Sequence, residues 1–144
     1  MTYFSGPKKH VLELTSDKDG KLFADVQIEG RPMRMFLDTG GYTILNASLA
    51  EELGLELKET ENDATWLSGA RDKRWTTNVD LKLGELRITD YPVSCVDLSS
   101  FERFSKSNGI EEFGGVIGSD LLEILRSTIH YETSRLSIKR PKRQ

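Results

Sequence analysis

Alternating apolar and polar positions run through the first third of this 144-residue chain. Between residues 21 and 28, aliphatic side chains occupy the even positions, while polar residues and Phe23 occupy the odd ones. This period of two predicts a half-buried β-strand with Phe23 on the face opposite the aliphatic residues. The stretch SDKDG precedes the strand, and its Asp19 and Gly20 are a hairpin turn signal. We therefore expect a hairpin with an earlier strand at residues 10–15.

A second alternating strand, MRMFLD, ends at Asp38. Met33, Met35 and Leu37 share one face of this strand, while Phe36 and Asp38 point to the other. A carboxylate at the end of an apolar strand is either a turn residue or a group that the protein uses, because Asp is an ordinary turn former. The residue alone leaves both interpretations open.

Two short segments are predicted to be helices. In NASLAEELGL, Ser48 and Glu51 have the spacing of a capping box, and Gly54 is a stop signal. In SDLLEILRS, Asp120 and Glu123 have the same spacing. We expect Asp120 to cap its helix, although an acid after Gly-Ser could also be considered as a second catalytic group. Each helix follows an apolar strand and a glycine, which suggests a weak internal repeat.

The remaining segments also favour strands and turns. A hairpin is expected with its tip around Gly69–Lys73 and with Trp66 and Trp75 on its two arms, as flap residues or as a cross-strand aromatic pair. A tight turn is expected at Gly84–Glu85, followed by the strand YPVSCVDL, a polar loop at residues 99–114 and a final strand or hairpin in STIHYETSRLSIK. The pattern predicts a mainly β protein with two short helices.

Length and charge narrow the class of protein. The chain is long enough for one domain without staples, and we divide it into a flexible leader at residues 1–10, a domain at residues 11–138 and a basic, solvated tail at residues 139–144. The formal net charge of −3 does not suggest a nucleic-acid or membrane-surface protein. No run reaches membrane-spanning length, and the start lacks the apolar middle of a signal peptide. We therefore expect a cytoplasmic location, with a periplasmic or membrane-tethered location as the alternative if a leader precedes these residues.

Cysteine and histidine offer little chemistry. The single cysteine, Cys95, excludes an internal disulfide and is expected in the core. His10 and His130 have no readable partner for a nucleophile–base pair, and their spacing gives no metal site. We expect no metal and no cofactor. Any catalysis should therefore rest on carboxylates.

Asp38 is followed by Thr39, Gly40 and Gly41, and a second apolar strand later ends in Val116, Ile117 and Gly118 before a short helix. Together, MFLDTGGYTILNASLAEELGL and GVIGSDLLEILRSTIHYETSRLSI resemble the retropepsin-like aspartic proteases over residues 11–138. The resemblance implies a closed acid-protease-like β-barrel, formed by a single lobe with a flap hairpin. It also implies an aspartic-type endopeptidase, a hydrolase of the acid protease fold.

The resemblance assigns a role to each motif. Two carboxylates held ~3 Å apart cannot both ionise, so they share a proton and supply one base and one acid. This chain has one such acid, and a two-fold dimer would place Asp38 opposite its own copy. Thr39 would then hydrogen-bond across the dimer axis, while Gly40 would let its amide approach the carboxylate. Polypeptide substrate would bind as an added strand beneath the flap. The flap residues would be Trp66, Leu67, Ser68, Gly69 and Ala70.

Three features depart from the family. Gly41 stands where Ala or Ser is usual, the flap segment GARDKR is charged rather than glycine-rich, and His130 stands where Asp is frequent. Because a fold does not imply a function, a catalytically silent, dimeric peptide-binding module of the same fold is the alternative. A phosphate-binding loop at DTGG is disfavoured because it lacks the lysine and the glycine spacing of such loops.

Overall fold

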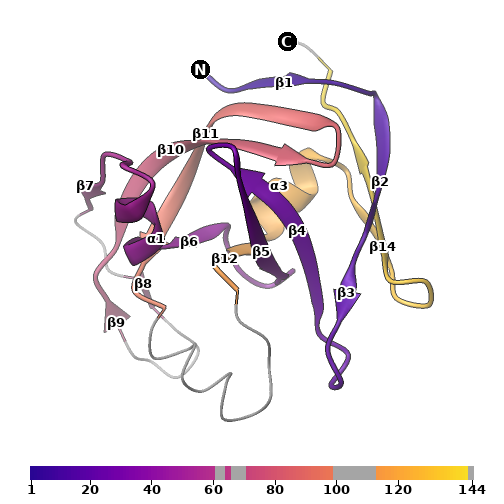
Figure 1. Cartoon of the computed structure of the whole chain (residues 1–144), viewed down its shortest axis with the longest axis horizontal. Coiled ribbons are helices and arrows are strands. Elements are labelled where there is room, and N and C mark those ends of the chain that lie inside the picture. Colours follow the sequence, from indigo (N-terminus) through magenta and orange to yellow (C-terminus); the bar gives the residue numbers. More distant parts are fainter. Residues whose placement is uncertain (61–63, 66–70, 99–112, 143–144) are drawn as a thin grey trace.

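Six strands close into a β-barrel in the computed structural model, which describes residues 1–60, 64–65, 71–98 and 113–142 (Figure 1). Around the barrel, each strand pairs with the next and the last pairs with the first. In spatial order the strands are β11 (Leu86–Val96), β6 (Ile44–Asn46), β12 (Gly115–Ile117), β5 (Arg31–Leu37), β4 (Leu22–Ile28) and β10 (Trp75–Leu83). The predicted mainly β architecture with a closed barrel is therefore confirmed.

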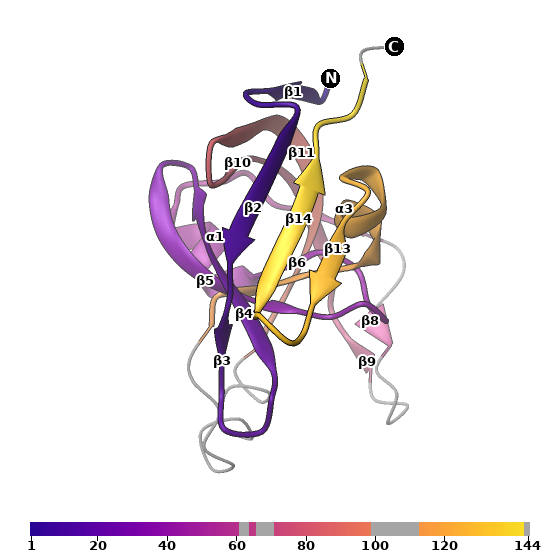
Figure 2. The ribbon, with the colours of Figure 1, turned by 90° about the vertical axis from the view of Figure 1, so that its right-hand side faces the viewer.

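Short strands extend the barrel at its edges. β1 (Tyr3–Ser5) pairs with β11, β3 (Thr15–Ser16) with β4, and β7 (Lys58–Glu59) with β10. A separate sheet is formed by β13 (Thr128–His130), β14 (Arg135–Lys139) and β2 (Lys9–Glu13), in that order. Figure 2 shows β2 and β14 side by side, with both ends of the chain above them. No helix in the part of the chain that the structure describes is long and apolar enough to cross a bilayer.

The predicted hairpin at Asp19–Gly20 is present between β3 and β4. Gly20 has a φ of +82°, which glycine adopts without a steric penalty. The Asp17 carboxylate accepts hydrogen bonds from the backbone N–H groups of Asp19 and Lys21, at 2.9 and 2.8 Å. Most of the earlier segment pairs elsewhere, however, because β2 joins β14 rather than β4.

The core has two parts, and this corrects the expectation for Phe23. The aliphatic residues of β4 are buried inside the barrel as predicted, but Phe23 is also buried, at 1% exposed. Phe23 packs on the outer face of β4 against Phe36 and Phe113, with ring centroids 5.6 and 5.9 Å away. Val116 belongs to this outer cluster. Both faces of β4 are therefore covered at this point, which a simple alternation does not show.

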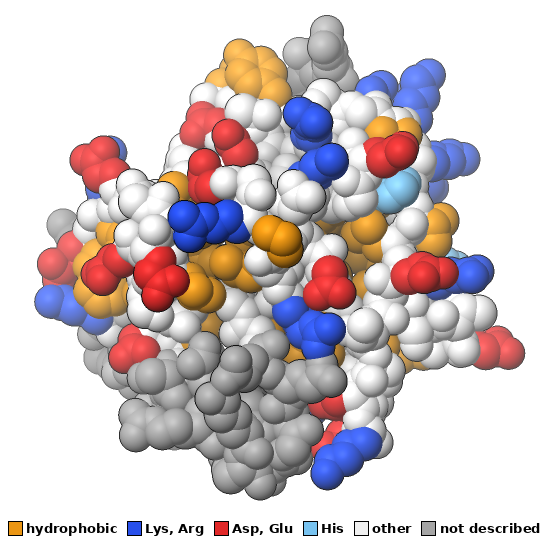
Figure 3. Space-filling view, viewed as in Figure 1, with side chains coloured by type: hydrophobic (Ala, Val, Ile, Leu, Met, Phe, Trp, Pro, Cys, Tyr) orange, Lys and Arg blue, Asp and Glu red, His pale blue; other side chains and the backbone are white. Residues whose placement is uncertain are grey.

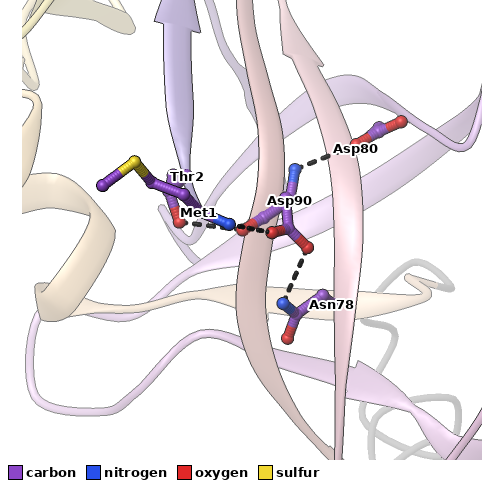
Figure 4. Close-up of polar contacts among 5 residues, drawn as sticks. All are labelled: Met1, Thr2, Asn78, Asp80 and Asp90. Carbon is purple, nitrogen blue, oxygen red and sulfur yellow. Dashed lines mark hydrogen bonds and ion pairs between the residues drawn. The ribbon is translucent and has the colours of Figure 1, made fainter.

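β10 and β11 form the long hairpin predicted at Gly84–Glu85, with Leu83 opposite Leu86. Its ladder shifts register at a bulge, where Asp90 has a φ of +60°. Asp90 accepts hydrogen bonds from the amino group of Met1 at 2.6 Å and from the Asn78 amide at 2.7 Å (Figure 4). These two bonds lower the pKa of the Asp90 carboxyl, the Met1 amino group having the larger effect. The bulge therefore anchors the start of the chain.

The two helices lie where they were predicted, but their predicted caps are wrong. Helix α1 (Ala47–Glu52) begins after Asn46, and helix α3 (Ser119–Ile124) begins after Gly118. Neither of these N-cap residues makes a side-chain capping bond. Ser48 and Asp120 are each the second residue of their helix, because β6 leads directly into α1 and only Gly118 separates β12 from α3. The stop at Gly54 is confirmed, with a φ of +73°.

The C-terminal hairpin of β13 and β14 is present as expected. His130 has a partner that the sequence did not reveal, since its Nε2 lies 3.0 Å from the Ser137 hydroxyl on the neighbouring strand. This pair is exposed on the small sheet, away from the barrel. Cys95 is fully buried as predicted, and burial raises the pKa of its thiol to about 11.

Candidate active site

Asp38 directly follows β5, and its side chain is half-buried. Its backbone N–H donates to the carbonyl of Ile117 at 3.0 Å, which continues the pairing of β5 with β12 by one residue. The N–H of Gly40 donates to Asp38 Oδ1, also at 3.0 Å. The end of β5 and the glycine turn therefore fix the orientation of the carboxylate.

The late apolar-apolar-Gly motif lies beside the Asp38 strand. β5 and β12 are parallel, with Phe36 opposite Val116 and Leu37 opposite Ile117. Val116 faces the outer cluster, while Ile117 is buried in the barrel core. The two motifs that the sequence identified separately are thus hydrogen-bonded neighbours. This juxtaposition places the start of α3 against the loop that follows Asp38.

Glycine is required at position 118 because the loop after Asp38 lies so close to its Cα. A Cβ at this position would lie 2.2 Å from the carbonyl carbon of Tyr42 and 2.4 Å from the carbonyl oxygen of Gly41. Ser119 donates to the same Gly41 oxygen, from its N–H at 2.7 Å and its hydroxyl at 3.1 Å. No side chain larger than hydrogen fits at Gly118 unless the loop moves.

Asp120 also holds the loop, which corrects its predicted role as a helix cap. Its Oδ1 accepts from the N–H and the hydroxyl of Thr43, at 2.7 and 2.9 Å. Its Oδ2 accepts from the Tyr91 hydroxyl at 2.6 Å. Desolvation, together with the hydrogen bond and the negative charge of Asp120, raises the pKa of Tyr91 above its usual range. Asp120 is thus committed to structural bonds and is not placed as a second catalytic acid.

Sequence reasoning missed this Thr43–Asp120–Tyr91 network. Thr43 is 3% exposed and lies just before β6, whereas Tyr91 is 4% exposed and lies in β11. The only available signal was a polar residue, Thr43, inside the otherwise apolar stretch that follows the glycines. Because the partners lie 29 and 77 residues from Asp120 along the chain, no local spacing could have paired them.

Gly41 leaves room for the Asp38 carboxylate. A Cβ at Gly41 would lie 2.9 Å from Asp38 Oδ2, whereas at Gly40 it would lie 3.5 Å from Oδ1. The glycine at position 41 therefore avoids a close contact between a Cβ and Asp38 Oδ2. The Asp38 carboxylate keeps its hydrogen bond from the Gly40 amide.

The surface around Asp38 is open. Thr39 and Gly40 are exposed, and the Tyr42 side chain is 73% exposed. Within the described part of the chain, the Thr39 hydroxyl forms no hydrogen bond. No group of three or more His, Cys, Asp or Glu side chains that could hold a metal is found among the described residues. The site therefore presents one carboxylate, one free hydroxyl and one exposed aromatic ring.

The predicted flap falls largely outside the described residues. Ala64–Thr65 (β8) pairs with Arg71–Asp72 (β9) in an antiparallel ladder. β9 therefore occupies part of the predicted tip at Gly69–Lys73, while residues 66–70 lie outside the described part of the chain. Trp75 lies opposite Glu59 and Cys95. The predicted flap residues that lie outside the described part are Trp66, Leu67, Ser68, Gly69 and Ala70.

Comparisons with known proteins agree with this geometry. The model of a family described as aspartyl protease matches residues 24–121, about two thirds of the chain. A search of curated proteins finds no significant match. Similar solved structures include a retropepsin-like aspartic protease from Rickettsia conorii, with 16% identity, a TM-score of 0.59, and coverage of 97% of this chain and 94% of that one.

Two further structures are similar. EIAV protease in complex with the inhibitor HBY-793 has 17% identity and a TM-score of 0.59, over 81% of this chain and 98% of that one. The retroviral protease-like domain of Ddi1 from Leishmania major has 16% identity and a TM-score of 0.57, over 82% and 87%. The fold is thus that of a retropepsin-like aspartic protease. With the family model covering both motifs, the chain belongs to the aspartyl protease family.

Proposed function

We propose that this protein is an aspartic peptidase that works as a two-fold dimer, in which Asp38 and Asp38 of the partner subunit activate a water molecule. The observation that carries the proposal is the position of Asp38. It directly follows β5 where this strand pairs with β12, and its loop is fixed by the Gly40 amide and by Asp120. A single lobe of this kind supplies half of an acid pair.

The chemistry requires two carboxylates that share one proton. The ionised one takes a proton from water as it attacks the peptide carbonyl, and the protonated one donates to the carbonyl oxygen. An isologous dimer brings two identical surfaces together, so a residue near the axis meets its own copy. The exposed loop of Asp38, Thr39 and Gly40 offers such a surface. The Thr39 hydroxyl, which has no bond within the described chain, is free to donate across the axis.

The fold supports a polypeptide as the substrate class. An extended polypeptide would lie across the two Asp38 loops and add a strand between them and the flap hairpins. Main-chain hydrogen bonds would hold it, and alternate side chains would enter pockets on either side. Tyr42, which is exposed in the same loop four residues after Asp38, would line one of these pockets.

The direct test is cleavage of a peptide library by the wild type and by Asp38→Asn. We expect the variant to lose activity by roughly 10²–10⁴-fold or more, because it removes the shared acid–base pair. Asp19→Asn is the matched control, since Asp19 is exposed in the β3–β4 turn and the same charge is removed far from the barrel strands that hold Asp38. Unchanged cleavage by Asp38→Asn would refute the assignment.

A mixing experiment tests the shared dyad. When Asp38→Asn protein is added to wild type at constant total concentration and the subunits exchange, only dimers of two wild-type subunits retain both acids. Activity should then fall as the square of the wild-type fraction. A linear fall would show that each subunit acts alone. Wild-type protein that dimerises and binds peptides, yet cleaves none at any pH, would instead identify a silent peptide-binding module.

A further inference from the structure

A hollow of about 850 Å³ opens where three distant segments of the chain meet. They are the residues around β1 and β2, the end of α3, and β14 with the residues that follow it. Arg140 holds the last of these in place, because its N–H donates to the Lys8 carbonyl at 2.9 Å and its guanidinium donates to the Gly6 carbonyl. The start of the basic tail is therefore packed onto the N-terminal segment. The sequence had suggested a tail that is simply solvated.

The lining of this hollow is strongly basic, and we call it the basic hollow. None of its ten lining residues is acidic and six are cationic. The cationic residues are Lys8, Lys9, Arg126, Lys139, Arg140 and Lys142. Within the described part of the chain, none of the six forms an ion pair with an acid. Lys and Arg side chains gather at the upper right of the face shown in Figure 3. The chain as a whole is acidic, with a net charge of −3, so this concentration of positive charge is local.

Two features of the basic hollow work against the stability of the fold. Lys9 lies directly opposite Lys139 in the β2–β14 ladder, and like charges in that position repel each other. Arg126 has a φ of +44° just after α3, at a position where glycine is usual because it avoids steric strain. An anion bound between these side chains would offset the repulsion.

We propose that the basic hollow binds a compact anion that carries several phosphate groups. Arginine guanidinium groups pair with phosphate oxygens in a bidentate geometry, and lysines add point charges around them. Six cations around one hollow match a ligand of high charge density better than a single carboxylate. The volume lies in the range of small-molecule sites, and the exposed Ile124 and half-buried Phe4 provide an apolar surface for a carbon ring.

The shape favours a small molecule over a membrane surface or a nucleic-acid duplex. Lipid bilayers are flat on this scale, and a duplex presents phosphates along a convex rod. Here the cations come from three segments that surround a concavity. The proposal is independent of peptidase activity, since no residue of the Asp38 loop lines the basic hollow.

The test is calorimetric titration of the purified full chain with inositol hexakisphosphate and with tripolyphosphate at low ionic strength. We expect one site per chain and weaker binding as salt increases. The double variant Lys9→Gln/Lys139→Gln should bind roughly tenfold more weakly and, without ligand, should melt at a higher temperature. Lys18→Gln/Lys21→Gln is the control, because both lysines are exposed in the β3–β4 hairpin and the change in charge is the same.

A second pair of variants separates ligand binding from folding. Arg126→Gly removes a cation and relieves the strained backbone, so it should weaken binding several-fold while raising the melting temperature. Ser134→Gly relieves a similar strain, at a φ of +52°, without changing the charge, so it should raise the melting temperature and leave binding unchanged. Three results would overturn the proposal: no binding of either probe, equal losses in both lysine pairs, or binding of anionic lipid vesicles with no competition from the small anions.

Discussion

Removal of the Tyr91 hydroxyl should weaken the fold by a predictable amount. The hydroxyl donates to Asp120 Oδ2 at 2.6 Å, and the ring is 4% exposed, so Tyr91→Phe keeps the packing and deletes only the bond. A hydrogen bond to a charged group contributes about 1.5–3 kcal/mol. Asp120 is half-buried and keeps both bonds from Thr43, so water can partly replace the lost donor. We therefore expect a loss of about 1.5–2 kcal/mol in the free energy of unfolding.

The assay is urea unfolding at neutral pH, with the midpoint and slope fitted for wild type and variant. The expected loss corresponds to a fall of about 3–8 °C in melting temperature for a chain of this size. Tyr131→Phe is the control, because Tyr131 is 70% exposed and a surface change of this kind stays within about 0.5 kcal/mol. If Tyr91→Phe also costs less than about 0.5 kcal/mol, the Asp120 network does not stabilise the loop in the way proposed.

The pH dependence gives a second check on the same bond. The pKa of Tyr91 is raised in the folded state above its unfolded value near 10. Stability from this group is therefore fully present below pH 10 and is lost as pH rises through the folded pKa. Above pH 10 the wild type should lose stability faster than Tyr91→Phe, so the difference between the two proteins should shrink. A constant difference up to strongly alkaline pH would contradict this account.

Three other predictions follow from close contacts and burial. Gly118→Ala should lower the free energy of unfolding by about 1–3 kcal/mol in urea unfolding and should reduce peptide cleavage, because the added Cβ would clash with the Tyr42 and Gly41 backbone. Normal activity would show that the loop moves aside without cost. The Cys95 thiol, with its pKa raised to about 11, should react with alkylating reagents only as fast as the protein opens, and rapid labelling under native conditions would refute its burial. Ser48→Ala should change the free energy of unfolding by less than about 0.5 kcal/mol, because Ser48 does not cap α1. A loss near 1 kcal/mol would instead show that Ser48 acts as a cap.

Local patterns predicted much of this protein correctly. The period of two located β4 and β5, and the turn glycines located both tight hairpins, because side-chain alternation and positive φ angles depend on neighbouring residues alone. The Asp-Thr-Gly motif and the later apolar-apolar-Gly segment also identified the fold. These features are short in sequence and are therefore readable without the structure.

The local patterns were wrong where two alternatives had the same sequence signature. An acid near the start of a helix can cap that helix or accept hydrogen bonds from other segments. Asp120 does the latter, because Thr43 and Tyr91 donate hydrogen bonds to its carboxylate. Alternation also assumes a single buried face, whereas Phe23 packs into a second cluster on the outside of β4. Strand β6 (Ile44–Asn46) was missed because three residues carry too little periodicity.

The sequence by itself determined that the chain is a mainly β protein in which an acid, Asp38, follows an apolar strand. Only the tertiary structure decided what surrounds that acid. Gly41 and Ser119 are 78 residues apart and become hydrogen-bonded because β5 and β12 pair in parallel. The basic hollow likewise needs three segments that meet only after the barrel has closed. Pairing between distant strands depends on the packing of the whole chain, and no local spacing records it.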